Sequence, residues 1–245
     1  MKRQLVSASI AAIKVMRAVN PRIRICHIDP MINVIAEDPT PENVAMARAY
    51  HDSQFASCDM ITGRAAPELG GRNELVDFIG LNYYIHNQWT APGRAGSMLV
   101  PSDPRYRHVR DLLQENYSRY GKPIFVAETG IEDETRPAWL RYICNEVFAA
   151  MDAGVPMEGI CLYPILNHPG WDDDRHCHNG LFDYPNERGE REPYEPLALE
   201  LARQQQRAVR LLSGEETFVD RRVSDVSALD WAAHIMEKRT DESRS

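Results

Sequence analysis

One carboxylate stands out among the residues of this chain that could do chemistry. Glu128 ends the apolar run 124–127 and precedes Thr129 and Gly130. A carboxylate at the end of a buried strand is partly removed from water, so desolvation and neighbouring groups set its pKa. Glu128 is therefore a candidate nucleophile or general base. Its position fits a structural role equally well, as a helix cap or as half of an ion pair.

Polar and aromatic residues also follow the other predicted strands. The carboxyl ends of parallel strands meet at one edge of a sheet, where the following loops converge. Asn82 and Tyr84 could donate hydrogen bonds to Glu128 or to a substrate, although packing is the alternative for one of the adjacent pair Tyr83 and Tyr84. Trp171 suits stacking on a sugar face or covering the end of the sheet. The candidate substrate-binding residues are Trp171, Tyr163, His27 and His168.

A dense run of possible metal ligands, Trp-Asp-Asp-Asp-Arg-His-Cys-His, occupies 171–178. Its His and Cys residues are adjacent, so their side chains diverge, whereas zinc ligands are usually about two to four residues apart. We predict a solvated acidic loop and no metal site. A metal-dependent hydrolase built on His168, His176 and His178 is a weaker alternative. The chain has no Gly-x-Ser-x-Gly elbow and no nucleotide-binding motif, so no cofactor is predicted.

The composition excludes several classes of function. The 245 residues are 43% hydrophobic and 26% charged, which is typical of a globular protein with a substantial core. The net charge of −8 provides no positive field for a nucleic acid or an anionic membrane, so neither is a predicted partner. No apolar stretch approaches the roughly 18 to 20 residues of a membrane span, which predicts a cytoplasmic protein. The five cysteines include no Cys-x-x-Cys pair and are expected to be reduced.

Alternating helices and strands must position these residues. Hydrophobic periodicity and helix-stop residues predict one helix followed by four strand-then-helix units. The predicted strands are 22–28, 75–82, 123–128 and 158–163, and the predicted helices are 4–18, 40–62, 105–120, 136–153 and 194–212. This order is typical of an α/β protein with parallel strands, and four units make half of a (β/α)8 TIM-type barrel. We assign 1–212 to this partial barrel and 213–245 to a charged, partly disordered C-terminal tail.

Four strings along the chain carry a family resemblance. They are Asp77-Phe-Ile-Gly-Leu-Asn-Tyr-Tyr84, Pro123-Ile-Phe-Val-Ala-Glu-Thr-Gly130, Gly154-Val-Pro-Met-Glu-Gly159 and Asn179-Gly-Leu-Phe-Asp-Tyr184. In order and spacing they resemble glycoside hydrolase family 1, the β-glucosidase-like retaining glycosidases, over the second half of the family barrel. The resemblance implies that Glu128 is the catalytic nucleophile, that Tyr84 hydrogen-bonds its carboxylate, and that Asn82 is a polar active-site residue.

The chain also departs from the family pattern. A retaining glycosidase uses two carboxyl groups about 5 to 5.5 Å apart. The family's acid/base glutamate lies in an Asn-Glu-Pro motif, which is absent here. Trp171 and Tyr163 stand at the family's two aromatic positions, but Gly170 replaces a glutamate that contacts sugar hydroxyls, and Thr129 replaces an asparagine. A nucleophile without proton assistance loses about 10² to 10⁴ in rate.

The resemblance implies a glycoside hydrolase-like protein that hydrolyses O-glycosyl bonds of β-linked sugars in carbohydrate metabolism, with the acid/base half missing. The strands 22–28 and 158–163 would present unpaired edges. We therefore expect a chain derived from a longer glycosidase by truncation, which is either an incomplete gene product or a piece closed by a second copy or by a complementing chain. The alternative is a non-catalytic carbohydrate-binding or assembly subunit in which Trp171, Tyr84 and Tyr163 form an aromatic floor. Both interpretations predict a carbohydrate ligand.

Overall fold

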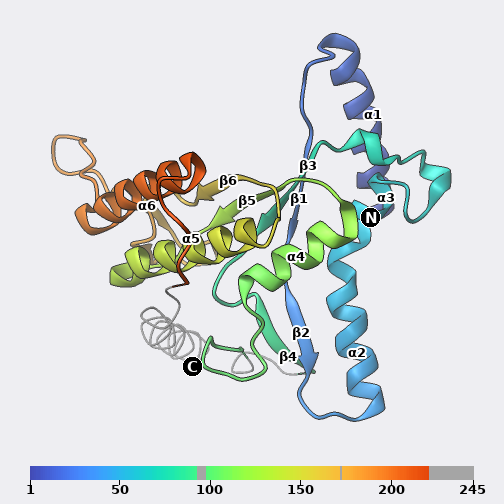
Figure 1. The fold of residues 1–245 in the computed structure, drawn as a ribbon, viewed down its shortest axis with the longest axis horizontal. Helices are drawn as coiled ribbons and strands as arrows, with labels where there is room; N and C mark the ends of the chain where they lie inside the picture. Colours follow the sequence, from blue (N-terminus) through green and yellow to red (C-terminus); the bar gives the residue numbers. More distant parts are fainter. Residues whose placement is uncertain (93–97, 172, 221–245) are drawn as a thin grey trace.

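Four parallel strands form the central sheet. The computed structural model describes residues 1–92, 98–171 and 173–220 (Figure 1). The strands are β1 (Cys26–Pro30), β3 (Phe78–Asn82), β5 (Ile124–Thr129) and β6 (Met157–Leu162), in the spatial order β1-β3-β5-β6. All three pairings are parallel, so the carboxyl ends of the strands lie at the same edge. Within the described part of the chain, β1 and β6 pair on one side only, and the sheet is open.

Helices cover one face of this sheet. They are α3 (Ala56–Ile61), α4 (Val109–Tyr120), α5 (Arg136–Asp152) and α6 (Glu195–Ser213), and α5 packs against both α4 and α6. Strand side chains on the helix side, such as Ile79 and Ile124, are at most 1% exposed. On the other face, Ile28 is 51% exposed. A parallel sheet is normally covered on both faces, so this sheet has one apolar face that the described chain leaves open.

Capping and stop residues set the helix ends that the sequence predicts. The side-chain oxygen of Thr40 accepts a hydrogen bond from the Asn43 backbone N–H at 3.2 Å, and Pro41 opens α2 (Pro41–Asp52). Gly121 adopts a φ of 61° and ends α4, because a left-handed residue after a helix is cheapest as glycine. These local signals set the start of α2 and the end of α4, the helix that precedes β5.

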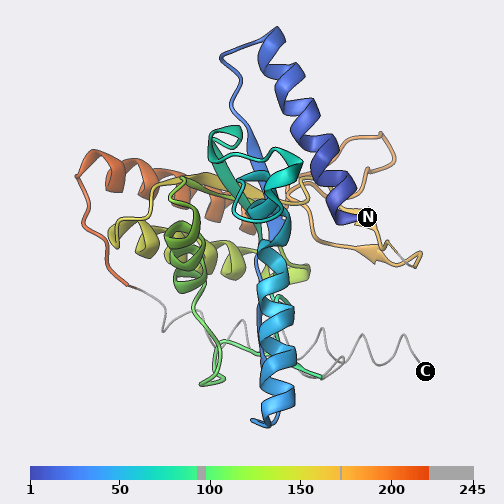
Figure 2. The same cartoon turned by 90° about the vertical axis from the view of Figure 1, so that its right-hand side faces the viewer.

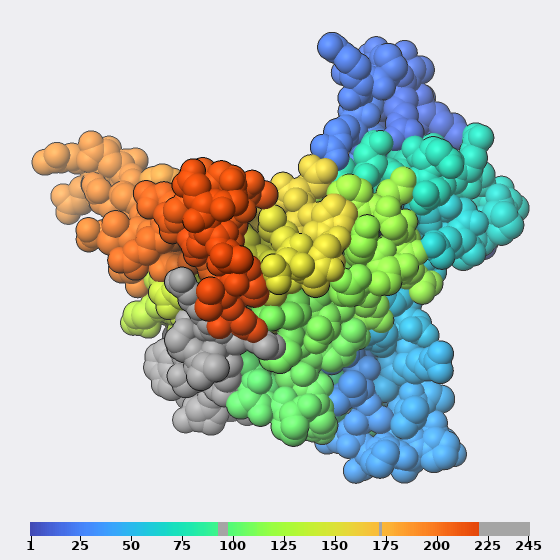
Figure 3. Space-filling view, viewed as in Figure 1, coloured from blue at the N-terminus to red at the C-terminus, as the bar shows by residue number. Residues whose placement is uncertain are grey.

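Two units project from the central body (Figures 1 and 3). The first is α1 (Lys2–Val19), which packs on α3 and buries Val6, Ile10 and Ile13. The second is a two-stranded parallel sheet of β2 (Asn33–Ala36) and β4 (Gln88–Ala91), with α2 packed along it. Figure 2 shows α2 extending away from the central sheet. None of the described helices is long and apolar enough to cross a membrane.

The structure confirms the α/β order and differs from the prediction locally. The predicted helix 40–62 is α2, a 3-10 turn at Ser53–Phe55, and α3. The segments expected as loops contain β2, β4 and the short antiparallel pair β7 (His168–Pro169) and β8 (His176–Cys177). The strand predicted at 22–28 begins only at Cys26. Residues 221–245 of the predicted tail, including its expected disordered end, lie outside the described residues.

Candidate active site

The ends of β3 and β5 bring Glu128 and Tyr84 together. In the sheet register Asn82 lies opposite Glu128, after an irregularity that follows Leu81. The backbone N–H of Tyr83 donates to the Glu128 carbonyl at 2.9 Å, so the chain leaving β3 continues beside β5. The next side chain, Tyr84, donates its hydroxyl hydrogen to Oε2 of Glu128 at 3.0 Å. The predicted contact between these two residues is therefore present.

The environment keeps Tyr84 protonated. Burial, followed by the hydrogen bond to the Glu128 carboxylate, raises the pKa of Tyr84 well above its ordinary value. Tyr84 therefore remains a hydrogen-bond donor through the whole neutral range. Glu128 itself is partly buried at the end of β5. One of its carboxylate oxygens, Oε2, is held by Tyr84, so the orientation of the group is fixed.

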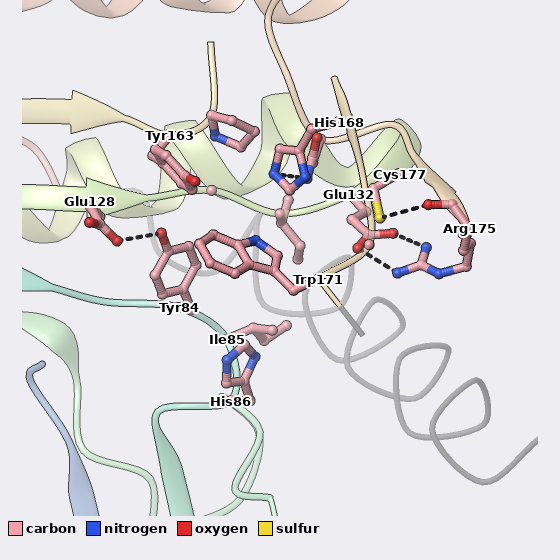
Figure 4. A pocket seen from close by; sticks show the side chains of 15 residues that line it. Tyr84, Ile85, His86, Glu128, Glu132, Tyr163, His168, Trp171, Arg175 and Cys177 are labelled. Atoms are coloured by element: carbon pink, nitrogen blue, oxygen red, sulfur yellow. Dashed lines mark hydrogen bonds and ion pairs between the residues drawn. The ribbon is translucent and has the colours of Figure 1, made fainter. Parts of the chain in front are cut away.

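A pocket of about 510 Å³ opens next to this pair (Figure 4). Its lining includes five of the seven predicted site residues, namely Tyr84, Glu128, Tyr163, His168 and Trp171. Figure 4 shows Trp171 between the Glu128–Tyr84 pair and an opposite end formed by Glu132 and Arg175. The prediction that residues after different strands converge is thus realised for these five side chains.

Aromatic surface dominates the open side of the pocket. Trp171 is 85% exposed and Tyr163 is 37% exposed. Large aromatic side chains are usually more buried than this. The rings of Tyr163 and His168 lie 6.4 Å apart, and the rings of Tyr84 and His86 are stacked at 5.9 Å. An exposed aromatic face next to a carboxylate can stack on the apolar face of a sugar ring.

The opposite end of the pocket holds an ion pair that the sequence reasoning missed. Arg175 donates to both carboxylate oxygens of Glu132, at 2.6 and 3.0 Å. The β7–β8 pairing places His168 opposite Cys177, and burial raises the pKa of the Cys177 thiol. No local signal in the sequence predicts the ion pair between Arg175 and Glu132, because these two residues lie 43 positions apart.

Asn179 is a second pocket residue that the sequence reasoning did not single out. Its Nδ2 lies 3.1 Å from Nε2 of His168. Its Oδ1 is buried and has no hydrogen-bond partner among the described residues. A buried acceptor without a partner is costly, so this oxygen is a ready acceptor for a ligand hydroxyl. Asn179 does occur in one of the four family-like strings, which was the available signal.

Asn82 lies beside Glu128 in the sheet, outside the set of residues that line the pocket. Its backbone carbonyl accepts hydrogen bonds from the Met31 N–H at 2.9 Å and from Nδ2 of Asn87 at 3.2 Å. Its side-chain Oδ1 is buried without a hydrogen-bond partner among the described residues. Asn82 is thus the register partner of Glu128, the candidate nucleophile, and its side-chain Oδ1 is available to accept a hydrogen bond.

The structure does not bring His27 into the pocket. Nε2 of His27 lies 2.7 Å from a carboxylate oxygen of Asp29, and that same oxygen accepts a hydrogen bond from Ser57 of α3 at 2.5 Å. These contacts place His27 on the helix-covered side of β1. Its neighbours Cys26 and Ile28 occupy the other face, against Gly80. His27 and Asp29 at the end of β1 therefore form hydrogen bonds on the α3 side of the sheet and do not line the pocket.

Two departures from the family strings have local structural reasons. The hydroxyl of Thr129 accepts a hydrogen bond from the Trp139 indole N–H at 2.8 Å, and Thr129 is fully buried. At Gly170 a Cβ atom would lie 1.9 Å from Oδ1 of Asp173, so a larger residue there requires Asp173 to move.

The described residues contain no group of three or more His, Cys, Asp or Glu side chains that could hold a metal ion, and this includes His176 and His178.

The chemistry available to this site follows from one oriented carboxylate. Glu128 can attack an electrophilic carbon, and Tyr84 can hold the carboxylate while it does so. The pocket contains a second carboxylate, Glu132, but both of its oxygens are bound by Arg175. Arg175 and Glu132 therefore shape the far end of the pocket, and Glu132 is not poised to donate a proton.

Sequence comparison gives no relative. No protein-family model matches the chain, and no curated protein matches it.

Solved structures, in contrast, share its fold. They include a β-glycosidase from the hyperthermophile Thermosphaera aggregans, with a TM-score of 0.64 and 17% identity over 83% of this chain and 48% of that chain. A family 1 β-glucosidase from Thermotoga maritima matches with a TM-score of 0.63 and 16% identity, over 84% of this chain and 56% of that chain. A β-glucosidase from Pyrococcus furiosus matches with a TM-score of 0.62 and 17% identity, over 84% and 46%.

The chain thus spans about half the length of the solved structures it matches. At this level of identity the likeness concerns the fold. The open sheet of four parallel strands with its helices is a partial TIM-type β/α barrel, and it has the fold of about half of a β-glucosidase.

Proposed function

We propose that this chain is a glycoside hydrolase-like protein, related to family 1, in which Glu128 is the nucleophile toward β-linked sugars. The observation that carries the proposal is the 3.0 Å hydrogen bond from Tyr84 to Glu128, at the mouth of an aromatic-lined pocket. The likeness of the fold to β-glucosidases supports the same class of reaction. The substrate would be an O-glycoside whose ring stacks on Trp171 and Tyr163.

In the proposed reaction, a carboxylate oxygen of Glu128 attacks the anomeric carbon and forms an ester bond to it. The bond to the leaving-group oxygen breaks, and that oxygen departs with the electron pair and requires a proton unless it is already a stable anion. Water then attacks the anomeric carbon, the ester bond breaks and releases Glu128 as a carboxylate, and the proton lost by the water passes to the solvent. Tyr84 keeps Oε2 of Glu128 oriented during the attack and stabilises the carboxylate when it is released.

The proton donor is the missing part. Glu132 is tied to Arg175, and the chain has no Asn-Glu-Pro motif. We propose that the acid/base half of the machinery is absent from this chain. The chain alone should then react only with glycosides whose leaving groups need no proton. Natural β-glycosides should react slower by about 10² to 10⁴ than with a complete pair of carboxyl groups.

An activated fluoro-sugar tests the nucleophile. Incubation with 2,4-dinitrophenyl 2-deoxy-2-fluoro-β-glucoside should add one fluoroglucosyl group, and peptide mass spectrometry should place it on Glu128. Glu128→Gln should give no label, and Tyr84→Phe should label more slowly. The matched control Glu134→Gln, an exposed residue on the segment after β5, should label like the parent. A label on another residue, or none after prolonged incubation, would contradict the proposal.

The exposure of Trp171 favours a second candidate, a non-catalytic carbohydrate-binding subunit. A side chain 85% exposed at a pocket rim is available to a sugar whether or not chemistry follows. The same experiment separates the two functions. Calorimetric binding of a β-glucoside that depends on Trp171, combined with no labelling of Glu128, would support the binding subunit.

A further inference from the structure

The two outer strands of the central sheet present matched free edges. β1 and β6 each lack a neighbour on one side within the described residues, and both are five to six residues long. Unpaired N–H and C=O groups along such edges are templates for another strand. Both edges belong to a parallel sheet, so a strand added in parallel to β6 would have the direction of β1.

The open face of the same sheet carries apolar side chains, and at its amino end the Arg24 guanidinium lies over the Phe78 ring, 4.7 Å from the ring centroid. Ile28 of β1 is 51% exposed, and Cys161 of β6 is exposed as well. The helix-side residues of the neighbouring strands are almost completely buried, with Ile79 at 1% and Ile124 at 0%. Water therefore contacts a face whose composition suits the interior of a barrel.

Helix α1 adds a second apolar strip. Its buried face is formed by Val6, Ile10 and Ile13. A different row, at the 3-4 spacing of one helix face, is exposed to solvent, and it consists of Leu5, Ala8, Ala12, Val15 and Val19. Leu5 is 61% exposed and Val19 is 83% exposed. A helix that is apolar on two faces normally packs against two neighbours, and the described chain supplies only one.

The charges on the two edges are complementary. Arg24 lies just before β1, and Glu158 is the second residue of β6, so both mark the amino ends of their strands. In a single chain their bidentate ion pair, at 2.7 and 3.2 Å, must reach across the three strand spacings that separate β1 from β6. The two side chains remain 54% and 33% exposed. If β1 lay beside β6 of another copy, the same two residues would be neighbours at one spacing, about 4.8 Å.

We propose that two copies of this chain close one eight-stranded barrel, with β1 of each copy pairing in parallel with β6 of the other. Eight is the number of strands at which a β/α sheet closes with a filled interior. A twofold axis along the barrel satisfies both free edges of both copies at once and covers the open apolar face. Arg24 of each copy then contacts Glu158 of the other. The inference concerns closure alone and stands independently of the chemistry of Glu128.

Charge reversal with mixing tests this arrangement. Sedimentation velocity and native mass spectrometry should find the unmodified chain as a species of twice 27.9 kDa. Arg24→Glu and Glu158→Arg should each weaken self-association, by about tenfold for each of the two reversed contacts and thus about 100-fold in all. Mixing the two variants should restore a two-chain species that contains one copy of each, because both contacts between the copies are then of opposite charge.

The control variant is Arg48→Glu. It makes the same charge change in an exposed i,i+4 pair with Asp52 on α2, and it should leave self-association unchanged. Circular dichroism checks that each variant is folded. The mixing step distinguishes contacts between copies from the pair within one chain, because an intrachain pair cannot be repaired by a second molecule.

Three results would overturn the proposal. The unmodified chain could be monomeric at all concentrations, as expected if a different half-barrel chain covers the open face. The single reversals could leave a dimer intact, which would place its interface elsewhere. The mixture could fail to form the mixed species, which would confine the Arg24–Glu158 contact to one chain.

Discussion

The indole N–H of Trp139 donates a hydrogen bond to the Thr129 hydroxyl at 2.8 Å, directly behind the residue that carries the candidate nucleophile. Trp139 is 1% exposed, and the ring of Tyr83 is stacked on it, with the centroids 6.0 Å apart and the planes within 4°. Each of these supporting residues is adjacent in sequence to a pocket residue, since Tyr83 precedes Tyr84 and Thr129 follows Glu128. Trp139 therefore supports both strand ends from the buried side, through its hydrogen bond to Thr129 after Glu128 and its stacking on Tyr83 before Tyr84.

Removing this acceptor should destabilise the protein. Thr129→Val keeps the shape of the side chain but leaves the Trp139 N–H buried without a partner, which costs about 1 to 3 kcal/mol of unfolding free energy. Urea unfolding followed by circular dichroism measures the change. Thr129→Ser retains the hydroxyl and should cost less than Thr129→Val. Equal losses for the two variants would mean that the hydrogen bond is not the stabilising feature.

The pKa of Tyr84 should report the contact with Glu128. Burial is the larger cause of the raised pKa, and the hydrogen bond to the carboxylate adds to it. Glu128→Gln removes the negative charge, so the pKa of Tyr84 should fall toward its ordinary value while remaining above it. NMR titration of ¹³Cζ-labelled tyrosine measures this shift. The exposed control Glu134→Gln should leave the Tyr84 titration unchanged, and an unshifted Tyr84 in Glu128→Gln would show that the two groups do not interact.

Three hydrogen-bonded tyrosines, of which Tyr83 and Tyr142 are buried and Tyr106 is partly buried, should make the fold sensitive to alkali. The hydroxyls of Tyr83 and Tyr106 lie 2.8 Å apart, and those of Tyr106 and Tyr142 lie 2.7 Å apart. Burial raises the pKa of Tyr83 to about 12, and it raises those of Tyr106 and Tyr142 well above the usual value. In the unfolded chain these groups lose their protons near pH 10. The folded state therefore holds more protons above that pH.

Because the folded state holds more protons than the unfolded chain above about pH 10, raising the pH lowers the free energy of unfolding. The stabilising contribution of the three groups is complete below about pH 10 and is lost as the pH rises from about 10 through 12, by about 1.4 kcal/mol per pH unit for each tyrosine. Urea unfolding at several alkaline pH values measures the slope. Tyr83→Phe should reduce it by one tyrosine's share, whereas Tyr50→Phe, at a side chain 53% exposed, should not. A slope that Tyr83→Phe leaves unchanged would contradict this account.

The order of elements was readable from the sequence because short-range signals determine it. Gly121 stops α4, Thr40 and Pro41 start α2, and the apolar runs before Asn82 and Glu128 form buried strands. The pairing of β2 with β4 was not predictable in the same way. These four-residue strands join segments about 55 positions apart, and neither carries a distinctive pattern on its own. Their pairing depends on the tertiary structure.

The site could be predicted where residues lie at the end of a parallel strand or in the loop that follows it. Glu128, Tyr84, Tyr163, His168 and Trp171 converge because parallel strands end at one edge. His27 failed to join them because the predicted strand 22–28 carries apolar residues on both faces, Ile23 and Ile25 on one and Ile28 on the other, so alternation does not reveal which face His27 occupies. The Arg175–Glu132 pair and the Asn179–His168 contact depend on how β7 and β8 fold over the pocket, which no local pattern specifies.

Glu146 and Arg110 offer the most stringent test of the packing between α4 and α5. The Glu146 carboxylate is completely buried, and Arg110 of α4 donates to it through Nε at 3.1 and 3.2 Å. The same carboxylate accepts the Arg110 backbone N–H at 3.1 Å and so satisfies a free donor in the first turn of α4. Arg110→Met should cost about 3 to 5 kcal/mol of unfolding free energy, because a buried carboxylate then lacks its cation.

The double variant Arg110→Met/Glu146→Met provides the control. A buried ion pair is often replaceable by well-packed apolar residues at little cost, so most of the loss should be recovered. The remaining deficit should be about 1 kcal/mol, because the Arg110 backbone N–H still lacks its acceptor and the 3.0 Å contact from Arg110 to Asp220 is lost. Chemical denaturation of the two single variants and the double variant gives the coupling energy. A double variant as unstable as the sum of its parts would mean that the pair contributes through packing volume and not through charge.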